Sequence, residues 1–189
     1  MASDFIADKL EQYRPQNIVL DPVMISKSGF DLMQPEAKEA LISRLIPLAY
    51  VITPNLPEAE VITGRRIQNL EEMEQAARDI YAMGAKNVLI KGGHLENDAT
   101  DLLFDGTSVT TLHSERIATK NTHGTGCTLS SCIAANLAKG KTVEEAVRIA
   151  KAYITTAIAH ALEIGKGVGP TNHFYELYTK AGIWDEIKD

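Results

Sequence analysis

Cysteine is scarce in this sequence of 189 residues. The cysteines are Cys127 and Cys132, and with four residues between them they form neither a disulfide framework nor a convincing zinc set. We therefore expect a reducing compartment. The 19 Lys and Arg residues are outnumbered by 25 Asp and Glu residues and lie scattered along the chain, which argues against a nucleic-acid partner.

Long apolar runs are missing as well. The N-terminal segment carries Asp4 and Asp8 and lacks the basic start and apolar stretch of a signal peptide, and no segment approaches a transmembrane span. These absences predict a cytoplasmic protein with no membrane partner. Internal repeats and linkers are also lacking, so we expect one domain over residues 1–189, with enough apolar residues (44%) for a proper core.

What the chain does contain is an alternation of apolar runs and helical periodicities. Compact apolar runs predict buried strands at 17–22, 50–55 and 86–93. Helical spacing predicts helices at 3–13, 35–49, 57–63, 71–83, from just after Gly126 to about Ala138, at 143–162 and in the C-terminal tail. The segment 101–112 predicts a β-hairpin around Asp105 and Gly106. This alternation predicts an α/β fold with a largely parallel sheet.

Polar residues follow each of the predicted parallel strands. They are Asp21 after the first strand, Thr53, Asn55 and Glu58 after the second, and Lys91 after the third. Because the carboxyl ends of parallel strands meet at one edge of a sheet, we expect these residues to face a common crevice. Acids there can hold hydrated Mg²⁺, and a lysine can reach a phosphate. Taken one at a time, turn or helix capping by the acids and a solvated lysine explain them as well.

A glycine-rich stretch, "NTHGTGCTLSS" at 121–131, leads into a predicted helix. Gly124 and Gly126 let backbone amides approach a ligand at the helix N-terminus, which suits an anion such as phosphate. A glycine turn without a ligand is the alternative, and the P-loop pattern is absent. Cys127 lies in the first helical turn, where a thiolate is favoured, although a lone cysteine is also commonly a buried apolar residue. A covalent nucleophile would need a base such as His123 and a third, orienting group, and that set is incomplete.

Four motifs together carry a family resemblance: "DPVM" at 21–24, "TPNLPEAEVITG" at 53–64, "KGGH" at 91–94 and "THGTGCTLSS" at 122–131. With them, and with "GVGPTNH" in the tail, the chain closely resembles the hydroxymethylpyrimidine/phosphomethylpyrimidine kinases of thiamine biosynthesis, members of the ribokinase-like superfamily. The resemblance spans essentially all of the chain. It implies a ribokinase-like three-layer α/β/α fold whose N-terminal strands are missing here.

The resemblance implies catalytic roles for the glycine stretch. Gly124, Thr125 and Gly126 look like the anion hole that stabilises the transferring phosphoryl group, with Gly124 and Gly126 also contacting ATP. Most of the superfamily carries an aspartate base at the next position, whereas the pyrimidine kinases carry a cysteine. Cys127 therefore looks like the group that contacts the substrate and accepts the proton of its hydroxymethyl group.

The resemblance also implies roles at the strand ends. Glu58 looks like the acid that organises Mg²⁺ through water, assisted by Asp21. Lys91 and Asn55 look like contacts to ATP, and Val23 looks like a wall of the pyrimidine pocket. The implied cofactor is Mg²⁺, the implied co-substrate is ATP, the small-molecule partner is a pyrimidine, and the implied assembly is a homodimer.

The expected function is ATP-dependent phosphorylation of 4-amino-5-hydroxymethyl-2-methylpyrimidine and of its monophosphate to the diphosphate. A pyridoxal/pyridoxine kinase is the alternative within the same fold. A second alternative is a non-catalytic nucleotide-binding fragment. It is favoured because the family's first third, with the glycine-rich segment that forms much of the pyrimidine pocket, has no counterpart in this sequence.

Overall fold

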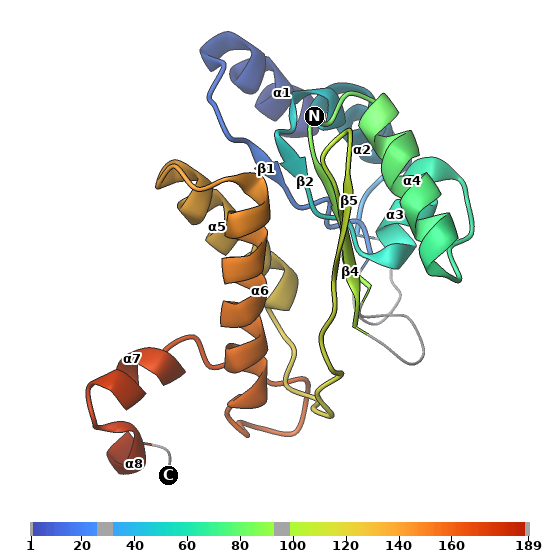
Figure 1. Cartoon of the computed structure of the whole chain (residues 1–189). Coiled ribbons are helices and arrows are strands. Elements are labelled where there is room, and N and C mark those ends of the chain that lie inside the picture. The colour runs from blue at the N-terminus through green and yellow to red at the C-terminus, as the bar shows by residue number, and fades with distance from the viewer. Residues whose placement is uncertain (1, 26–31, 93–98, 188–189) are drawn as a thin grey trace. The chain divides into compact units, whose positions relative to one another are not determined.

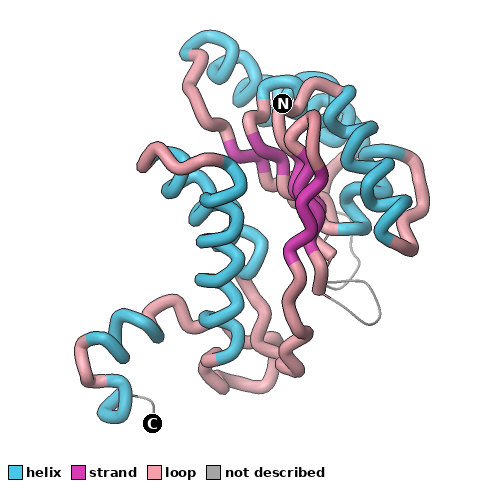
Figure 2. Tube along the Cα trace, in the orientation of Figure 1, coloured by secondary structure: helices cyan, strands magenta, loops and turns pink. Residues whose placement is uncertain are grey.

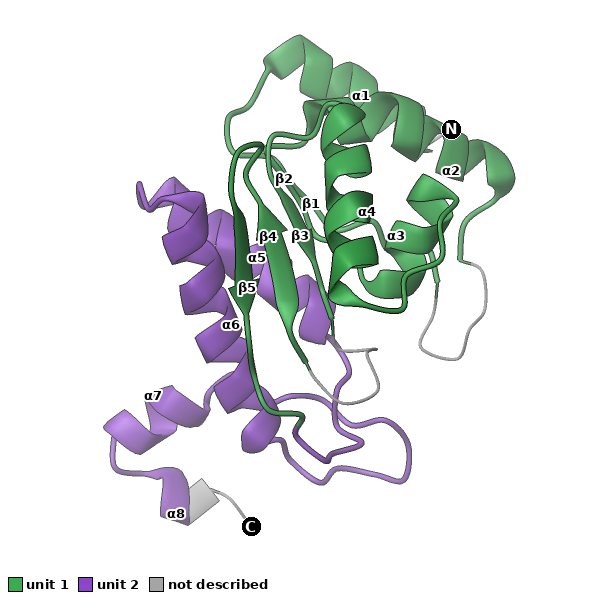
Figure 3. Cartoon of the chain, turned by 45° about the vertical axis from the view of Figure 1, so that its right-hand side comes forward, with its two compact units in different colours: residues 1–116 green, residues 117–189 purple. Residues whose placement is uncertain are grey.

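The computed structural model describes residues 2–25, 32–92 and 99–187 (Figure 1). The chain divides into two compact units, unit 1 with residues 1–116 and unit 2 with residues 117–189 (Figure 3). Unit 1 contains the β-sheet, whereas the regular structure described in unit 2 is helical (Figure 2). No helix among the described residues is long and apolar enough to cross a bilayer.

The sheet of unit 1 has five strands in the order β1-β2-β3-β4-β5. Their bounds are Val19–Leu20, Val51–Ile52, Val88–Ile90, Asp101–Phe104 and Val109–Leu112. β1, β2 and β3 are mutually parallel, and β4 is antiparallel to both β3 and β5. β5 therefore runs in the direction of β1 to β3, and the sheet is mainly parallel in direction, as the sequence predicts. The parallel strands are shorter than expected, and Pro22 and Pro54, which cannot donate to a ladder, follow the first two.

The predicted hairpin is confirmed, with β4 and β5 joined through residues 105–108. The carboxylate of Asp105 accepts hydrogen bonds from the backbone N–H groups of Ser108 (2.7 Å) and Thr107 (2.8 Å), which lower the pKa of Asp105. Gly106 has a φ of +94°, and a Cβ there would overlap the ring of Tyr81. The turn thus needs both an acceptor side chain and a glycine.

The described part of unit 1 also contains α-helices. They are α1 (Ala2–Tyr13), α2 (Pro35–Ala40), α3 (Leu56–Thr63) and α4 (Leu70–Ala82). The sequence predicts one helix over 35–49, but after α2 the chain continues as a π-helix, η1 (Leu41–Leu45), and a 3₁₀ turn, η2 (Ile46–Leu48). Pro47 has no N–H to donate to the preceding turn, and this accounts for the loss of α-helical hydrogen bonding.

The core of unit 1 lies between the sheet and these helices. α4 packs against β3 and β4, and α1 packs against η1. The largest fully buried side chains of this core include Met24, Ile46, Ile52, Met73, Ile80, Ile90 and Leu102. Leu89 and Leu103 are buried too, and alternation along a strand directs them to the opposite sheet face.

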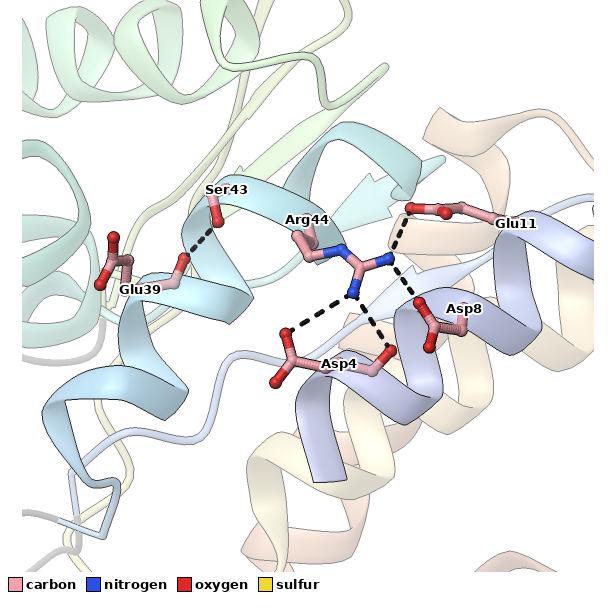
Figure 4. A network of polar contacts seen from close by, with 6 residues as sticks. All are labelled: Asp4, Asp8, Glu11, Glu39, Ser43 and Arg44. Carbon is pink, nitrogen blue, oxygen red and sulfur yellow. Dashed lines mark hydrogen bonds and ion pairs between the residues drawn. The ribbon is translucent and has the colours of Figure 1, made fainter. Parts of the chain in front are cut away.

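Arg44 of η1 joins its segment to α1 by ion pairs (Figure 4). One guanidinium nitrogen lies 2.7 Å from a carboxylate oxygen of Asp8 and 3.2 Å from one of Glu11. The other lies 3.6 Å from the carboxylate of Asp4 and donates to the backbone carbonyl of Asp4. These three acids stand four and three residues apart on α1, so one face of the helix carries them all.

Unit 2 is built on two packed helices, α5 (Thr125–Ala138) and α6 (Val143–Ala159), followed by α7 (Tyr175–Lys180) and α8 (Trp184–Ile187). Leu129, Ile133 and Leu137 of α5 are buried, as are Val147 and Ile154 of α6. α5 begins inside the glycine stretch rather than after it, and α6 ends three residues before the predicted 162. The tail, for which one short helix is expected, forms two.

Candidate active site

Five polar residues at the carboxyl ends of β1, β2 and β3 form what we call the strand-end cluster: Asp21, Thr53, Asn55, Glu58 and Lys91. The ammonium nitrogen of Lys91 lies 3.0 Å from Oδ1 of Asp21. The hydroxyl of Thr53 donates to the same oxygen at 3.3 Å. Residues from three neighbouring strands therefore meet at one edge of the sheet, as the parallel arrangement predicts.

Backbone pairing that continues past the strands holds this edge in register. The N–H of Thr53 donates to the carbonyl of Leu20, and the N–H of Lys91 donates to the carbonyl of Pro54 at 2.8 Å. Asn55 and Lys91 form a further parallel bridge. The cluster is consequently anchored by the main chain and not only by side-chain contacts.

The ion pair of Asp21 and Lys91 is largely shielded from water. The side chain of Asp21 is 13% exposed and that of Lys91 is 17% exposed, while Thr53 is fully buried. Hydrogen bonds between ionised groups are stronger than neutral ones, and shielding strengthens them further. Lys91 thus presents a fixed positive charge at the strand ends.

Glu58 is the most deeply buried acid of the cluster, with 2% of its surface exposed. It forms a capping box at the start of α3: its carboxylate accepts from the N–H of Asn55 at 2.8 Å, and its own N–H donates to Oδ1 of Asn55 at 2.9 Å. Burial raises the pKa of Glu58, and the nearby negative charge of Asp21 acts in the same direction. The Asn55 hydrogen bond and the positive charge of Lys91 oppose this shift.

The carboxylates of Asp21 and Glu58 fit a hydrated Mg²⁺ better than a fully protein-ligated metal. Among the described residues no three His, Cys, Asp or Glu side chains gather to hold a metal ion. Mg²⁺ keeps several waters and takes one or two carboxylates together with phosphate oxygens, so two acids are enough. The raised pKa of Glu58 marks a carboxylate that a nearby cation would stabilise in its charged form.

Asp101 at the start of β4 is a member of this region that the sequence motifs do not single out. Its carboxylate accepts from the N–H of Gly92, directly after Lys91, at 2.9 Å. A Cβ on Gly92 would collide with the backbone carbonyl of Thr100, so only glycine fits there. The sequence signal that could have identified Asp101 is an acidic residue at the start of a buried apolar strand. Gly93 and His94 of the "KGGH" motif lie outside the described residues.

The glycine stretch of unit 2 forms the N-terminus of α5. Gly124 is the N-cap residue, with a φ of +83°, and no described side chain caps the helix through a hydrogen bond. The amides of the first helical turn, Thr125, Gly126 and Cys127, have no intrahelical acceptor. The side-chain hydroxyl of Thr125 donates a hydrogen bond to the carbonyl of Thr122 at 2.7 Å and so does not cap these amides. This is the loop-into-helix geometry that suits an anion.

The two cysteines have different surroundings. Cys127 is exposed in the first turn of α5, so the alternative that it is a buried apolar residue is wrong. Cys132 is half-buried one turn further on, and burial raises its pKa. Val23, the expected pocket wall, lies two residues after Asp21 and is 40% exposed.

Comparisons of the sequence with known proteins point to a kinase family. The family model described as phosphomethylpyrimidine kinase matches residues 2–172. The chain is 51% identical over 178 residues to the hydroxymethylpyrimidine/phosphomethylpyrimidine kinase of Haemophilus influenzae, which covers 91% of this chain and 64% of that protein. The chain thus spans less than two thirds of the length of this relative.

Solved structures show the same likeness. The crystal structure of the ADP complex of Bacillus subtilis pyridoxal kinase has a TM-score of 0.84 and 42% identity, covering 91% of this chain and 66% of that one. The phosphomethylpyrimidine kinase of Clostridium difficile has a TM-score of 0.72 and 50% identity, covering 81% of this chain and 62% of that one. The expected ribokinase-like α/β fold class is confirmed by these neighbours. With a family match that runs through both the strand-end cluster and the glycine stretch, the chain belongs to the phosphomethylpyrimidine kinase family.

Proposed function

We propose that this chain carries the phosphotransfer machinery of an ATP-dependent kinase. Its substrates are 4-amino-5-hydroxymethyl-2-methylpyrimidine and the monophosphate of that alcohol, which it converts to the diphosphate for thiamine biosynthesis. The observation that carries the proposal is the shielded, main-chain-anchored Lys91 beside Asp21, in a chain that matches the family over residues 2–172. A lysine that reaches phosphates and acids that hold Mg²⁺ are among the recurring parts of phosphoryl-transfer sites.

The strand-end cluster binds and orients the nucleotide in this proposal. Lys91 exchanges part of its contact with Asp21 for a phosphate oxygen of ATP, and Asn55 contacts the nucleotide close by. Asp21 and Glu58 hold a hydrated Mg²⁺, which when bound neutralises charge on the phosphates. The ADP complex of the Bacillus subtilis pyridoxal kinase supports ATP as co-substrate.

The glycine stretch supplies the chemistry at the transferring group. The amides of Gly124, Thr125 and Gly126 donate to oxygens of the phosphoryl group and stabilise its charge, with Gly124 and Gly126 also contacting ATP. Sγ of Cys127 accepts the proton of the substrate hydroxyl, whose oxygen then bonds to the γ-phosphorus while the bond to ADP breaks. In the second round an oxygen of the pyrimidine monophosphate attacks instead. The exposure of Cys127 supports its access to a substrate.

Further parts of the proposal rest on family membership. We place Val23 in the wall of the pyrimidine pocket, supported by its exposure next to Asp21. Both units belong to a single ribokinase-like domain, since one family match crosses their boundary at residues 116 and 117. We also propose that the protein acts in the cytoplasm and that it forms a homodimer; light scattering of the purified chain would test the dimer.

The pyridoxal kinase alternative is favoured by a specific observation, the TM-score of 0.84 with the Bacillus subtilis pyridoxal kinase. ATP consumption measured side by side with the pyrimidine alcohol and with pyridoxal separates the two. We expect turnover of the pyrimidine, with a kcat about 10²- to 10⁴-fold lower in Cys127→Ala, at little change in the KM for ATP. Cys127→Asp, which restores the superfamily's usual base, is the matched variant and should recover part of the loss.

Three results would count against this account. Turnover of pyridoxal alone would favour the alternative substrate. Near-normal kcat in Cys127→Ala would remove the base role of the thiol. Binding of Mg-ATP without any turnover, under reducing conditions, would favour a non-catalytic nucleotide-binding protein.

A further inference from the structure

The glycine stretch before α5 is tied to a second glycine-rich segment of the same unit. Asn121, at its start, is only 1% exposed, and Oδ1 of its side chain accepts from the N–H of Gly169 at 3.2 Å. Two residues further on, the N–H of His123 donates to the carbonyl of Gly169 at 3.0 Å. His123 and Pro170 also pair as a parallel bridge. One glycine therefore holds this stretch at two points.

Only glycine fits at position 169. A Cβ there would overlap Oδ1 of Asn121 and lie 2.8 Å from its Cγ. Asn121 could escape only by rotating its amide, which would break its bond to Gly169 inside a region where it has almost no exposure. Gly167, two residues earlier, offers a contrast, because a Cβ there meets nothing within 4 Å.

Residues 121–123, which Gly169 holds, lead directly into the Gly124–Cys127 turn that is proposed to bind an anion. His123 precedes Gly124, the N-cap of α5, and Thr125 bonds back to the carbonyl of Thr122. A shift of the backbone at His123 would therefore be passed to the amides of the first helical turn and to Cys127.

We infer that Asn121 is a positioning residue that acts through the backbone. By accepting from Gly169, it sets the orientation of the Gly124–Cys127 turn and hence the direction of the amides and thiol that the proposed function uses. The inference rests on that proposed function for its effect on catalysis. The brace itself, the Asn121–Gly169 pair, is a property of the fold and can be measured without turnover.

Amide hydrogen exchange of the intact chain tests the brace. In Gly169→Ala we expect the exchange of the His123 amide, and of peptides covering 121–127, to rise about ten-fold, because the bonds to Gly169 are lost. Gly167→Ala is the matched control and should exchange like the wild type. The double variant Asn121→Ala/Gly169→Ala removes the clash. Its increase in exchange should be no larger than that of the more affected of the two single variants, Asn121→Ala and Gly169→Ala.

Kinetics test the positioning role. Gly169→Ala should lower kcat by up to about 100-fold with the KM for ATP changed by less than about three-fold, since a misplaced turn impairs transfer more than nucleotide binding. A general loss of stability would instead lower the amount of active enzyme and the melting temperature, which an active-site titration and a thermal scan register. Gly167→Ala again serves as the control.

The outcomes separate the two proposals. Equal exchange in Gly169→Ala and Gly167→Ala, or additive increases in the double variant, would overturn the brace whatever the activity. Faster exchange with an unchanged kcat would overturn the positioning role. If the wild-type chain turns over no substrate, the proposed function fails, and the exchange result alone decides whether Asn121 and Gly169 hold the turn.

Discussion

At the scale of single residues, the side chain of Glu58 has two roles, one structural and one proposed for function. Its carboxylate closes the capping box of α3, and it lies in the cluster proposed to hold Mg²⁺. Burial makes its charged form costly and raises its pKa. A capping acid needs no such burial, because Glu145 closes the capping box of α6 on the surface with a lowered pKa. The burial of Glu58 is the feature that capping leaves unexplained.

The raised pKa of Glu58 predicts a pH dependence of stability. The folded chain holds the proton of Glu58 more tightly than the unfolded chain, whose value is near 4.5. Stability relative to a Glu58→Gln variant, which keeps an acceptor for Asn55, should therefore be highest below pH 4.5. It should fall as the pH rises through the folded pKa. Urea unfolding of both proteins from pH 4 to pH 8 measures the difference; a difference that is constant or grows with pH would contradict the burial argument.

The residues of the candidate site differ in how far sequence could reveal them. Asp21, Thr53 and Lys91 follow apolar runs, and the geometry of parallel strands brings them together without further information. The sequence does not identify Asp101, because its contact with Gly92 depends on the antiparallel pairing of β4 with β3. The pairing of Asn121 with Gly169 bridges 48 positions, and no local pattern encodes such a distance.

At the scale of elements, α1 is attached to its unit in two ways. Ala7 is fully buried in the core, while Asp4, Asp8 and Glu11 meet Arg44 at the surface. Phe5, Ile6 and Tyr13 of the same helix remain exposed. Since Ala7 and the partly buried Leu10 are the apolar side chains that α1 packs into the core, we expect the charged contacts to matter more here than in an ordinary surface pair.

Arg44→Met should therefore lower the melting temperature of the chain, and the loss should shrink at 1 M NaCl, where exposed charges are screened. Arg148→Met is the matched control, since Arg148 makes a single pair with Glu144 at i,i+4 spacing. It should have a smaller effect at low salt. Equal losses for the two variants at low salt, or a loss for Arg44→Met that does not change with salt, would show that the network does not hold α1.

The elements themselves follow from sequence where the signal is local. Pro57 and Gly64 mark the ends of α3, and Asp105 with Gly106 marks the hairpin, because helix-end and turn chemistry act within a few residues. The change from α2 to the π-helix η1 has no such marker ahead of Pro47, as helical periodicity looks the same in both. Strand lengths were overestimated because the predicted ranges include residues that flank the apolar runs, among them Pro22 and Pro54, which cannot donate to a ladder.

At the scale of the whole molecule, membership of the phosphomethylpyrimidine kinase family gives a common explanation to features whose role is ambiguous when each is considered alone. A lysine at a strand end, a buried acid and a glycine turn each have a structural explanation. Their occurrence in one chain that matches the family over residues 2–172 favours phosphotransfer. The chain spans 64% of its Haemophilus influenzae relative, so its own activity is the decisive question.

The most direct measurement is a ³¹P NMR time course of the purified chain with Mg-ATP and the pyrimidine alcohol. We predict that a monophosphate resonance appears first and is then replaced by diphosphate resonances, with two ADP formed for each pyrimidine consumed. A heat-inactivated sample and Cys127→Ala serve as controls and should show little change. ATP that stays intact while the chain binds it, or a reaction that stops after one phosphate, would contradict the proposed function.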